Sequence, residues 1–344
     1  MILGGAIASN NVGRIGRVLD AHSLGLFVEP SRLQYGSSPT APASLPYGTW
    51  NAITTGQTDP SGGTTAADCT VNYPGASVGK YDQTGAVSTP MTCSVWVQKG
   101  SGSGSYQLVV SNGTSNIAKG GTAGTAWTRD SLTYTSFSAQ SCYFLSMDNR
   151  DWTATGGTTA GARRAVLANH QIEAGKYPTS FIGTYNVTRA GERLSLDSTR
   201  AAQSLVGGRI AIYLRFRPLA ASSELGSGEG RLLAWAAGEV FVDPTSLYLK
   251  AIDGALYSQT ANSAISWSRY DLLEFVIEVG AGKSAIRWRV NGGSTNTASF
   301  STKDDTLGAL NLSAGLDVCN NAAGAQMPCV LEKLIPYVPG RAPF

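Results

Sequence analysis

The chain has 344 residues, enough for about two domains of ordinary size. Its 41 glycines and only 14% charged residues favour short strands joined by turns, and its 42% hydrophobic content excludes wholesale disorder. The formal net charge is +3 without any run of Lys or Arg, so we expect no nucleic-acid partner.

No apolar run approaches the ~20 residues that span a bilayer, so no membrane partner is expected. Residues 1–8 are apolar but lack the basic start of a secretory signal, which favours synthesis in a cytoplasm. The five cysteines are an odd number, which argues against a disulfide framework, and Cys93 alternates within a strand as a small core residue. Cys319 and Cys329 flank a loop and either pair or stay free. With two histidines and no Cys-x-x-Cys, we expect neither a metal site nor a cofactor.

In chain order, residues 1–26 are rich in Gly, Ala and Asn and are predicted to form an extended N-terminal arm. Residues 27–186 form the first predicted module. Gly, Ser and Asn clusters bound its β-patterned runs, which is typical of a β-sandwich. The strands expected here cover 26–28, 92–98, 106–111, 127–137, 142–147 and 164–173.

Residues 187–344 form the second predicted module. Its expected strands cover 209–217, 230–236, 240–242, 247–252, 255–259, 271–279, 284–290 and 330–338. Asp253-Gly254 and Asn291-Gly292 each follow a β run, as two-residue turns with positive φ do. The predicted fold class is therefore all-β, with two jelly-roll or concanavalin A-like β-sandwich domains behind the arm.

Several segments resemble one family, the appendage proteins of bacteriophage virions. They occur in the family's order: residues 25–32 (GLFVEPSR), 60–68 (PSGGTTAAD), 93–97 (CSVWV), 171–182 (QIEAGKYPTSFI) and 188–192 (TRAGE). The second module is similar to concanavalin A-like (laminin-G-like) sandwiches through residues 267–270 (WSRY) and 288–292 (WRVNG). In CSVWV a Cys stands where the family has Phe.

The resemblance implies a protein of the virion surface that is assembled in the host cytoplasm and contacts other capsid or tail subunits. The family usually carries this pair of modules at the end of longer fibres, whereas here it stands almost alone. That difference favours a capsid decoration or head-fibre protein over a tail fibre. A homotrimer is expected, because self-association multiplies weak contacts.

Catalysis by two carboxylates requires both to converge on one cleft. Glu274 and Glu278 are four residues apart on an expected strand, so they share a face. We expect Phe275 and Ile277 to face the core and both glutamates to face solvent. Without a Gly-x-Ser-x-Gly motif, a serine triad would depend on His170, which lies in a patterned strand and is expected to be packed there. We therefore expect no catalytic residue and no enzymatic activity.

The candidate ligand-binding residues are Asp148, Asp151 and Trp152, which lie in a polar, loop-like segment. Among the candidate platforms for a sugar ring (Trp127, Trp152, Trp235 and Trp267), Trp152 has the most polar surroundings. It either binds a sugar or plugs the end of a sandwich. Calcium at Asp148 and Asp151, or at Asp304-Asp305, is the weaker interpretation, because acidic loop residues are more often solvated turn formers.

The leading function predicted from the sequence is a non-enzymatic virion protein of the capsid-decoration or head-fibre type. The alternative is a tail-associated receptor-binding module for host-surface glycans. A third class, a glycan-cleaving enzyme, requires a carboxylate pair about 5–9.5 Å apart in a groove.

Overall fold

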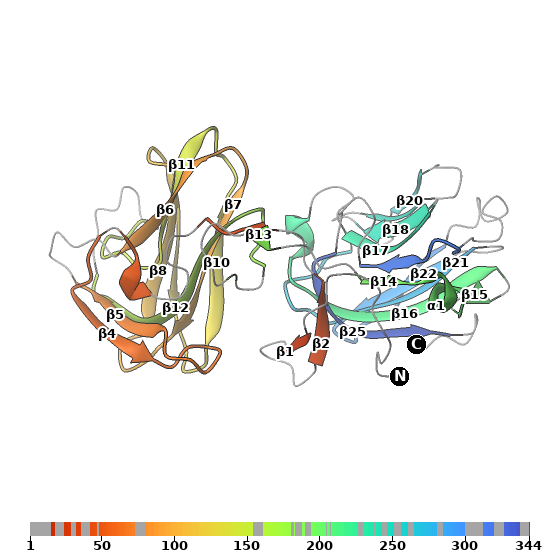
Figure 1. Cartoon of the computed structure of the whole chain (residues 1–344), viewed down its shortest axis with the longest axis horizontal. Coiled ribbons are helices and arrows are strands. Elements are labelled where there is room, and N and C mark those ends of the chain that lie inside the picture. The colour runs from red at the N-terminus through yellow and green to blue at the C-terminus, as the bar shows by residue number, and fades with distance from the viewer. Residues whose placement is uncertain are drawn as a thin grey trace. The chain divides into compact units, whose positions relative to one another are not determined.

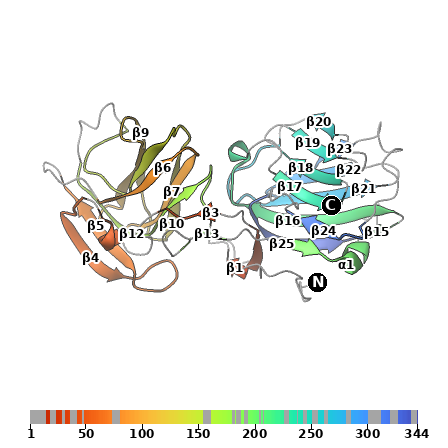
Figure 2. The ribbon, with the colours of Figure 1, turned by 45° about the horizontal axis from the view of Figure 1, so that its top comes forward.

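The computed structural model describes residues 15–17, 24–28, 32–35, 42–46, 48–72, 80–153, 161–179, 182, 188–189, 194–203, 205–206, 208–225, 230–236, 238–242, 246–250, 256–260, 265–280, 285–299, 312–319, 327–337 and 344. The chain divides into two compact units. The middle unit is Arg32–Arg189, and the terminal unit combines Met1–Ser31 with Ala190–Phe344. Both are built almost entirely of strands (Figures 1 and 2), which confirms the all-β prediction.

The middle unit is a β-sandwich whose two layers belong to one nine-stranded antiparallel sheet, joined where Arg164 pairs with Ser105. One layer has the order β4 (Ala52–Gln57), β5 (Ala66–Val71), β12 (Arg163–Ala174), β7 (Met91–Gln98) and β10 (Thr128–Tyr134). The other has the order β6 (Tyr81–Val87), β11 (Gln140–Leu145), β8 (Ser105–Ser111) and β9 (Asn116–Thr122). The short strands β3 (Arg32–Leu33) and β13 (Thr188–Arg189) pair with each other and join the two ends of the unit.

Alternation of side chains along these strands builds the core between the layers. From β8, Leu108 and Val110 point inward, and they meet Cys93 and Val95 from β7. Cys93 is fully buried, as predicted for a small core residue, and its Sγ lies 4.0 Å from that of Cys142. The pairing of β12 with β7 shifts register between Ala168 and Gln171, so β12 carries a bulge there.

The predicted family marker, residues 171–182, forms a buried polar network behind this bulge. Glu173 accepts hydrogen bonds from the Thr179 amide and hydroxyl and from the Gln171 side chain, and Gln171 in turn accepts the Ile182 amide. Burial raises the pKa of the Glu173 carboxyl, although the Arg129 guanidinium and these donors oppose the shift. The network fixes the chain where it leaves β12.

The terminal unit also has two sheets. One has the order β1 (Ile15–Arg17), β2 (Leu24–Val28), β25 (Cys329–Pro336), β16 (Arg209–Pro218), β21 (Leu273–Gly280), β22 (Ala285–Val290) and β23 (Asn296–Ser299), with β15 (Leu205–Val206) also paired to β16. The other has the order β14 (Leu194–Leu196), β24 (Leu316–Val318), β17 (Gly230–Trp235), β18 (Gly238–Val242), β19 (Ser246–Lys250) and β20 (Leu256–Thr260). A short helix, α1 (Ser198–Gln203), follows β14.

The N-terminal segment differs from the predicted arm and from the predicted boundaries of 1–26, 27–186 and 187–344. β2 pairs with β25 over Leu26 to Val28, and β1 pairs with β2, so both strands belong to the terminal unit. The reason is that β25 offers a free edge of backbone groups, which a short strand satisfies regardless of its position in the chain. Sequence pattern does not specify which edge such a strand joins.

The prediction that Glu274 and Glu278 face solvent was wrong for Glu274. Both lie on the outer face of β21, and Phe275 and Ile277 face the core as expected. Glu274 is nevertheless only 3% exposed, because Arg289 binds both of its oxygens at 2.6 and 3.0 Å and Tyr213 donates its hydroxyl at 2.5 Å. Arginines on neighbouring strands thus cover a carboxylate that the pattern of a single strand leaves open.

The other predictions about strands and turns agree with the structure where it describes them. Strands occur in every predicted strand range of 92–338, with ends shifted by a few residues. Asn291 and Gly292 have φ of 51° and 70°, as the predicted turn requires. Asp253-Gly254 lies outside the described residues. Cys319 and Cys329 are both buried and do not pair in a disulfide. No helix in the described part of the chain is long and apolar enough to cross a membrane.

Candidate functional site

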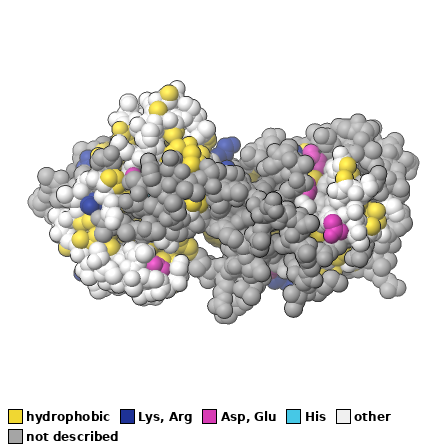
Figure 3. All heavy atoms as spheres, in the orientation of Figure 1, with side chains coloured by type: hydrophobic (Ala, Val, Ile, Leu, Met, Phe, Trp, Pro, Cys, Tyr) yellow, Lys and Arg dark blue, Asp and Glu magenta, His cyan; other side chains and the backbone are white. Residues whose placement is uncertain are grey.

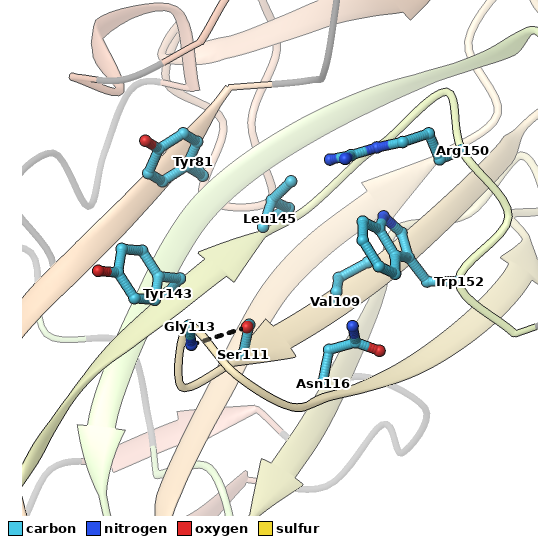
Figure 4. A pocket seen from close by; sticks show the side chains of 9 residues that line it. All are labelled: Tyr81, Val109, Ser111, Gly113, Asn116, Tyr143, Leu145, Arg150 and Trp152. Carbon is cyan, nitrogen blue, oxygen red and sulfur yellow. Dashed lines mark hydrogen bonds between the residues drawn. The ribbon is translucent and has the colours of Figure 1, made fainter. Parts of the chain in front are cut away.

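An open hollow of about 230 Å³ lies on the outer face of the β6–β11–β8–β9 layer of the middle unit. Figure 4 shows tyrosine rings at one end, Trp152 and Arg150 at the other, and Leu145 and Val109 between them. Its lining residues are Tyr81, Val109, Ser111, Gly113, Asn116, Tyr143, Leu145, Arg150 and Trp152.

Strand register brings these residues together. Leu145 of β11 lies opposite Tyr81 of β6 and opposite Val109 of β8. One step along the same face, Tyr143 lies opposite Ser111, which pairs with Asn116 of β9. The intervening residues point inward to the core, so alternation leaves an aromatic and aliphatic row on the outer face of the layer, where the two tyrosines are partly exposed and Val109 and Leu145 are buried. Tyr81 and Tyr143 have ring centroids 6.2 Å apart.

The far wall of the hollow is the loop after β11, and Asp148 holds it in place. This side chain is fully buried. It accepts a hydrogen bond of 2.7 Å from Trp152 Nε1 and bonds from Arg150 Nε and Nη2 of 3.2 and 2.9 Å. The Arg150 backbone amide donates to the same carboxylate at 2.9 Å. A buried carboxylate with four donors fixes both the indole and the guanidinium without a ligand.

Two further contacts support the loop from behind. Arg163 donates from Nη1 to the main-chain oxygens of Asp148 and Arg150. Gln107 of β8 donates to Asp151 at 3.1 Å and accepts the Trp152 amide at 3.3 Å. Burial lowers the pKa of Arg163, although Asp151 and Asp148 oppose the shift. The loop is therefore attached to the sheet at both its main chain and its side chains.

The structure places the three predicted ligand-binding residues in different roles. Trp152 borders the hollow and is half-buried. Asp148 lies behind the hollow, and both its oxygens accept bonds from Arg150 and Trp152, which leaves little capacity for a cation. Asp151 braces the loop through Gln107 and Thr153. No group of three or more potential metal ligands occurs among the described residues, and Asp304-Asp305 lie outside them.

The other candidate tryptophans are not among the residues that line the hollow. Trp127 packs against the cluster of Ala66, Trp96, Val166 and Ala168. Trp235 and Trp267 are buried, and Trp267 donates its indole N–H to the Ala220 carbonyl. His170 is also buried, as expected, with its ring stacked on Phe144 at 4.2 Å. Of the predicted platforms, Trp152 is the one that the hollow presents.

Sequence reasoning missed the opposite wall of the hollow. Tyr81 and Asn116 come from β6 and β9, which were not predicted as strands. β9 contains two glycines and little hydrophobic pattern, while β6 carries Asp82 and Thr84 on its inward face. Tyr143 lay in a predicted strand but had no signal that separated it from an ordinary surface tyrosine. The alternation of Tyr143 with buried Cys142 and Phe144 is the available clue.

The chemistry of the hollow is that of non-covalent binding. Its described lining contains aromatic and aliphatic groups, small polar side chains and one arginine, with no carboxylate. The two carboxyl groups that glycoside hydrolysis requires are therefore missing from this lining. In the view of Figure 3, basic side chains of the described residues are scattered and form no continuous track.

No family model matches the chain, and no curated protein matches its sequence. Among solved structures, the chain is similar to the LG1-3 region of the laminin alpha2 chain, with 9% identity, a TM-score of 0.31 and coverage of 75% of this chain and 64% of that one. It is also similar to domains LG4-5 of the mouse laminin alpha1 chain (10% identity, TM-score 0.24, 96% and 92% covered). A third similar structure is the CBM22-1-CBM22-2 tandem of Paenibacillus barcinonensis Xyn10C (11% identity, TM-score 0.22, 89% and 97% covered).

Proposed function

We propose that this chain is a non-catalytic protein displayed on a bacteriophage virion, and that its middle unit binds a host-surface glycan in the hollow beside Trp152. The observation that most supports binding is that the aromatic side chains at the edge of the hollow are held in place. Asp148, fully buried, holds the Trp152 indole in place, and the rings of Tyr81 and Tyr143 lie on the same sheet face.

The lining fits a sugar better than a drug-like or peptide ligand. A pyranose has an apolar face that packs on aromatic rings and a rim of hydroxyls that needs hydrogen-bond partners. Asn116, Ser111 and Arg150 supply polar groups around the apolar floor. At about 230 Å³ the hollow is smaller than the roughly 300–1,000 Å³ of enclosed small-molecule pockets. An open hollow of that size suits one sugar of a glycan whose remainder stays in solvent.

The positions of the acidic residues support a non-catalytic role. Asp148 and Glu274 each accept a bidentate arginine, and Glu173 is enclosed by Thr179 and Gln171. None of these side chains lines the hollow. A carboxylate already held by an arginine fork is a poor general acid, because protonation would break the ion pair.

The virion setting is supported by the order of the segments that resemble phage appendage proteins. Within that setting the hollow favours the receptor-binding role over a capsid decoration or head-fibre role. Mass spectrometry of purified particles should find the chain, and a density map should show whether it lies on the head or tail and whether it forms the expected trimer. Absence of the chain from purified particles would refute the virion role.

The binding role is tested with Trp152→Ala on an array of host-surface glycans. We expect wild-type binding to fall at least tenfold, because the variant removes one aromatic wall. Trp127→Ala is the matched control, since Trp127 is also half-buried in the middle unit but packs on the other layer. Equal binding by wild type and Trp152→Ala, or no binding by either, would refute the glycan role.

A further inference from the structure

We propose that the hollow selects glycans that end in an acidic sugar, whose carboxylate binds the guanidinium of Arg150. This inference rests on the glycan-binding function proposed above and adds the chemical class of the sugar. It names Arg150 as the specificity-determining residue.

The guanidinium of Arg150 has a second edge that can bind a carboxylate. An arginine can present two bidentate edges, one formed by Nε with a terminal nitrogen and one formed by the two terminal nitrogens. Asp148 occupies the Nε and Nη2 edge of Arg150. Within the described part of the chain, no hydrogen bond uses its Nη1, and the side chain stays 40% exposed. The edge formed by Nη1 and Nη2 is therefore available.

The hollow directs this edge toward a ligand. The Arg150 guanidinium lies 4.4 Å from the ring centre of Trp152, and Figure 4 shows the group extending over the floor of the hollow. Because Asp148 and Trp152 hold it from two sides, the fork loses little side-chain entropy when a ligand binds. A carboxylate matches this planar fork in shape and charge, whereas the hydroxyls of a neutral sugar accept weaker hydrogen bonds without charge assistance.

The charge around the hollow is also compatible with an anion. The described lining has one cationic side chain and no acidic one. Asp148 and Asp151, the nearby acids, are balanced by Arg150 and by Arg163, which lies on the main chain of the same loop. An incoming carboxylate would share Arg150 with Asp148, and the terminal unit holds the charge-reversed form of such sharing, with Glu332 bound by both Arg215 and Arg217.

The experiment compares ligands that differ only in the acid group or the acidic sugar. Sialyllactose is measured against lactose, and cellobiouronic acid against cellobiose, by calorimetry with the full chain at low and physiological salt. We expect at least one acidic ligand to bind tenfold or more tightly than its neutral counterpart, with the difference shrinking as salt rises.

The decisive variant is Arg150→Lys, which keeps a positive charge beside Asp148 but removes the fork. We expect it to lose the acid preference while retaining its melting temperature within a few degrees. Arg164→Lys is the matched control. Arg164 binds Asp68 through the same Nε and Nη2 edge at 3.0 and 2.8 Å and is 43% exposed, but it does not line the hollow.

The outcomes separate the two proposals. Trp152-dependent binding without preference for the acidic ligands would overturn the selectivity and leave the glycan role standing. A preference that survives Arg150→Lys would also overturn it, since the fork would then not be the determinant. Failure of every ligand and every arrayed glycan to bind would refute both. If Arg150→Lys unfolds, Arg150→Gln is titrated with the same ligands instead. Glutamine retains a hydrogen-bond donor but lacks the positive charge, so this variant should also lose the preference for acidic ligands.

Discussion

The two units contain the same arrangement of three side chains in different surroundings. In the middle unit Asp148 accepts both Nε and Nη2 of Arg150 and the indole N–H of Trp152. In the terminal unit Glu274 accepts both Nε and Nη2 of Arg289, as well as the hydroxyl of Tyr213. Each arginine lies over an aromatic ring, Trp152 at 4.4 Å and Phe344 at 4.3 Å.

The surroundings decide what the arrangement can do. Beside Glu274, further ion pairs occupy the sheet face, with Arg287 on Glu278 and with Arg215 and Arg217 on Glu332. All four arginines of this face, Arg215, Arg217, Arg287 and Arg289, therefore have their charges already paired. Arg150 instead borders a hollow whose lining includes Tyr81, Tyr143, Leu145 and Val109. An arginine held by a carboxylate only stabilises the fold where its other neighbours are charged. Where its other neighbours are aromatic, it can also contact a ligand.

The largest expected effect comes from neutralising the two carboxylates in parallel, with Asp148→Asn and Glu274→Gln. Each variant leaves a partly buried arginine without its counter-charge, so each should lower the free energy of unfolding of its own unit by about 2–4 kcal/mol. Urea denaturation followed by hydrogen exchange measures the two units separately. Only Asp148→Asn should also abolish glycan binding, because only it releases Trp152.

The contrast between the two units would be contradicted if Glu274→Gln weakened glycan binding as much as Asp148→Asn does.

The acid dependence of the terminal unit provides a second check. The Arg289 fork and the Tyr213 hydroxyl hold the pKa of Glu274 below its usual value, although burial opposes them. A lowered pKa means that this stabilisation is present above about pH 4.5 and is lost as the pH falls through the folded value. Glu274→Gln should remove that acid sensitivity.

A smaller effect concerns His170, which gives the middle unit a different response to pH. Burial lowers the pKa of His170 from 6.5 to about 3, and neither ring nitrogen has a hydrogen-bond partner among the described residues. The unfolded chain takes up this proton near pH 6.5 and the folded chain does not, so stability falls as the pH drops from 6.5 toward 3. At pH 5 the loss is roughly 2 kcal/mol.

His170→Phe should remove this loss, since a phenyl ring keeps the stack on Phe144 and does not titrate. The measurement is the difference in unfolding free energy of the middle unit between pH 7.5 and pH 5, in wild type and variant. Glu173 acts in the opposite direction, because its raised pKa favours the folded state as pH falls, but it is common to both proteins. An unchanged pH dependence in His170→Phe would show that other groups control it.

Much of the fold was predictable because the strands that build the cores carry strong alternation. β7, β8, β12, β16 and β21 each have a buried face, and all were predicted. The edge strands were harder. β1 lies in the predicted arm, and β6 and β9 were missed, because an edge strand needs only one paired side and can carry glycine or polar residues.

The site was predictable only in part, for a related reason. Trp152 was a reasonable candidate because an aromatic residue in a polar loop has few buried positions available to it. The roles of Asp148 and Arg150 were not, since a carboxylate in a loop looks the same whether it faces solvent or an arginine two residues away. Tyr81 and Tyr143 meet through the pairing of β6 with β11. That register depends on distant strands and cannot be read from either segment alone.

The smallest expected effect compares two glycines with positive φ, Gly113 beside the hollow at 88° and Gly292 in the predicted turn at 70°. Alanine at either position adopts a strained backbone, so each variant should lose about 1 kcal/mol of stability. A Cβ at Gly292 has no heavy atom within 4 Å, whereas one at Gly113 lies 3.5 Å from the Tyr143 ring. The methyl at Gly113 would make an ordinary contact with Tyr143 and would take up space in the lining of the hollow. Gly113→Ala should for that reason weaken glycan binding several-fold and Gly292→Ala should not, as titration of both variants would measure. Equal binding by the two would place the sugar away from Tyr143 and confine the site to the Trp152 wall.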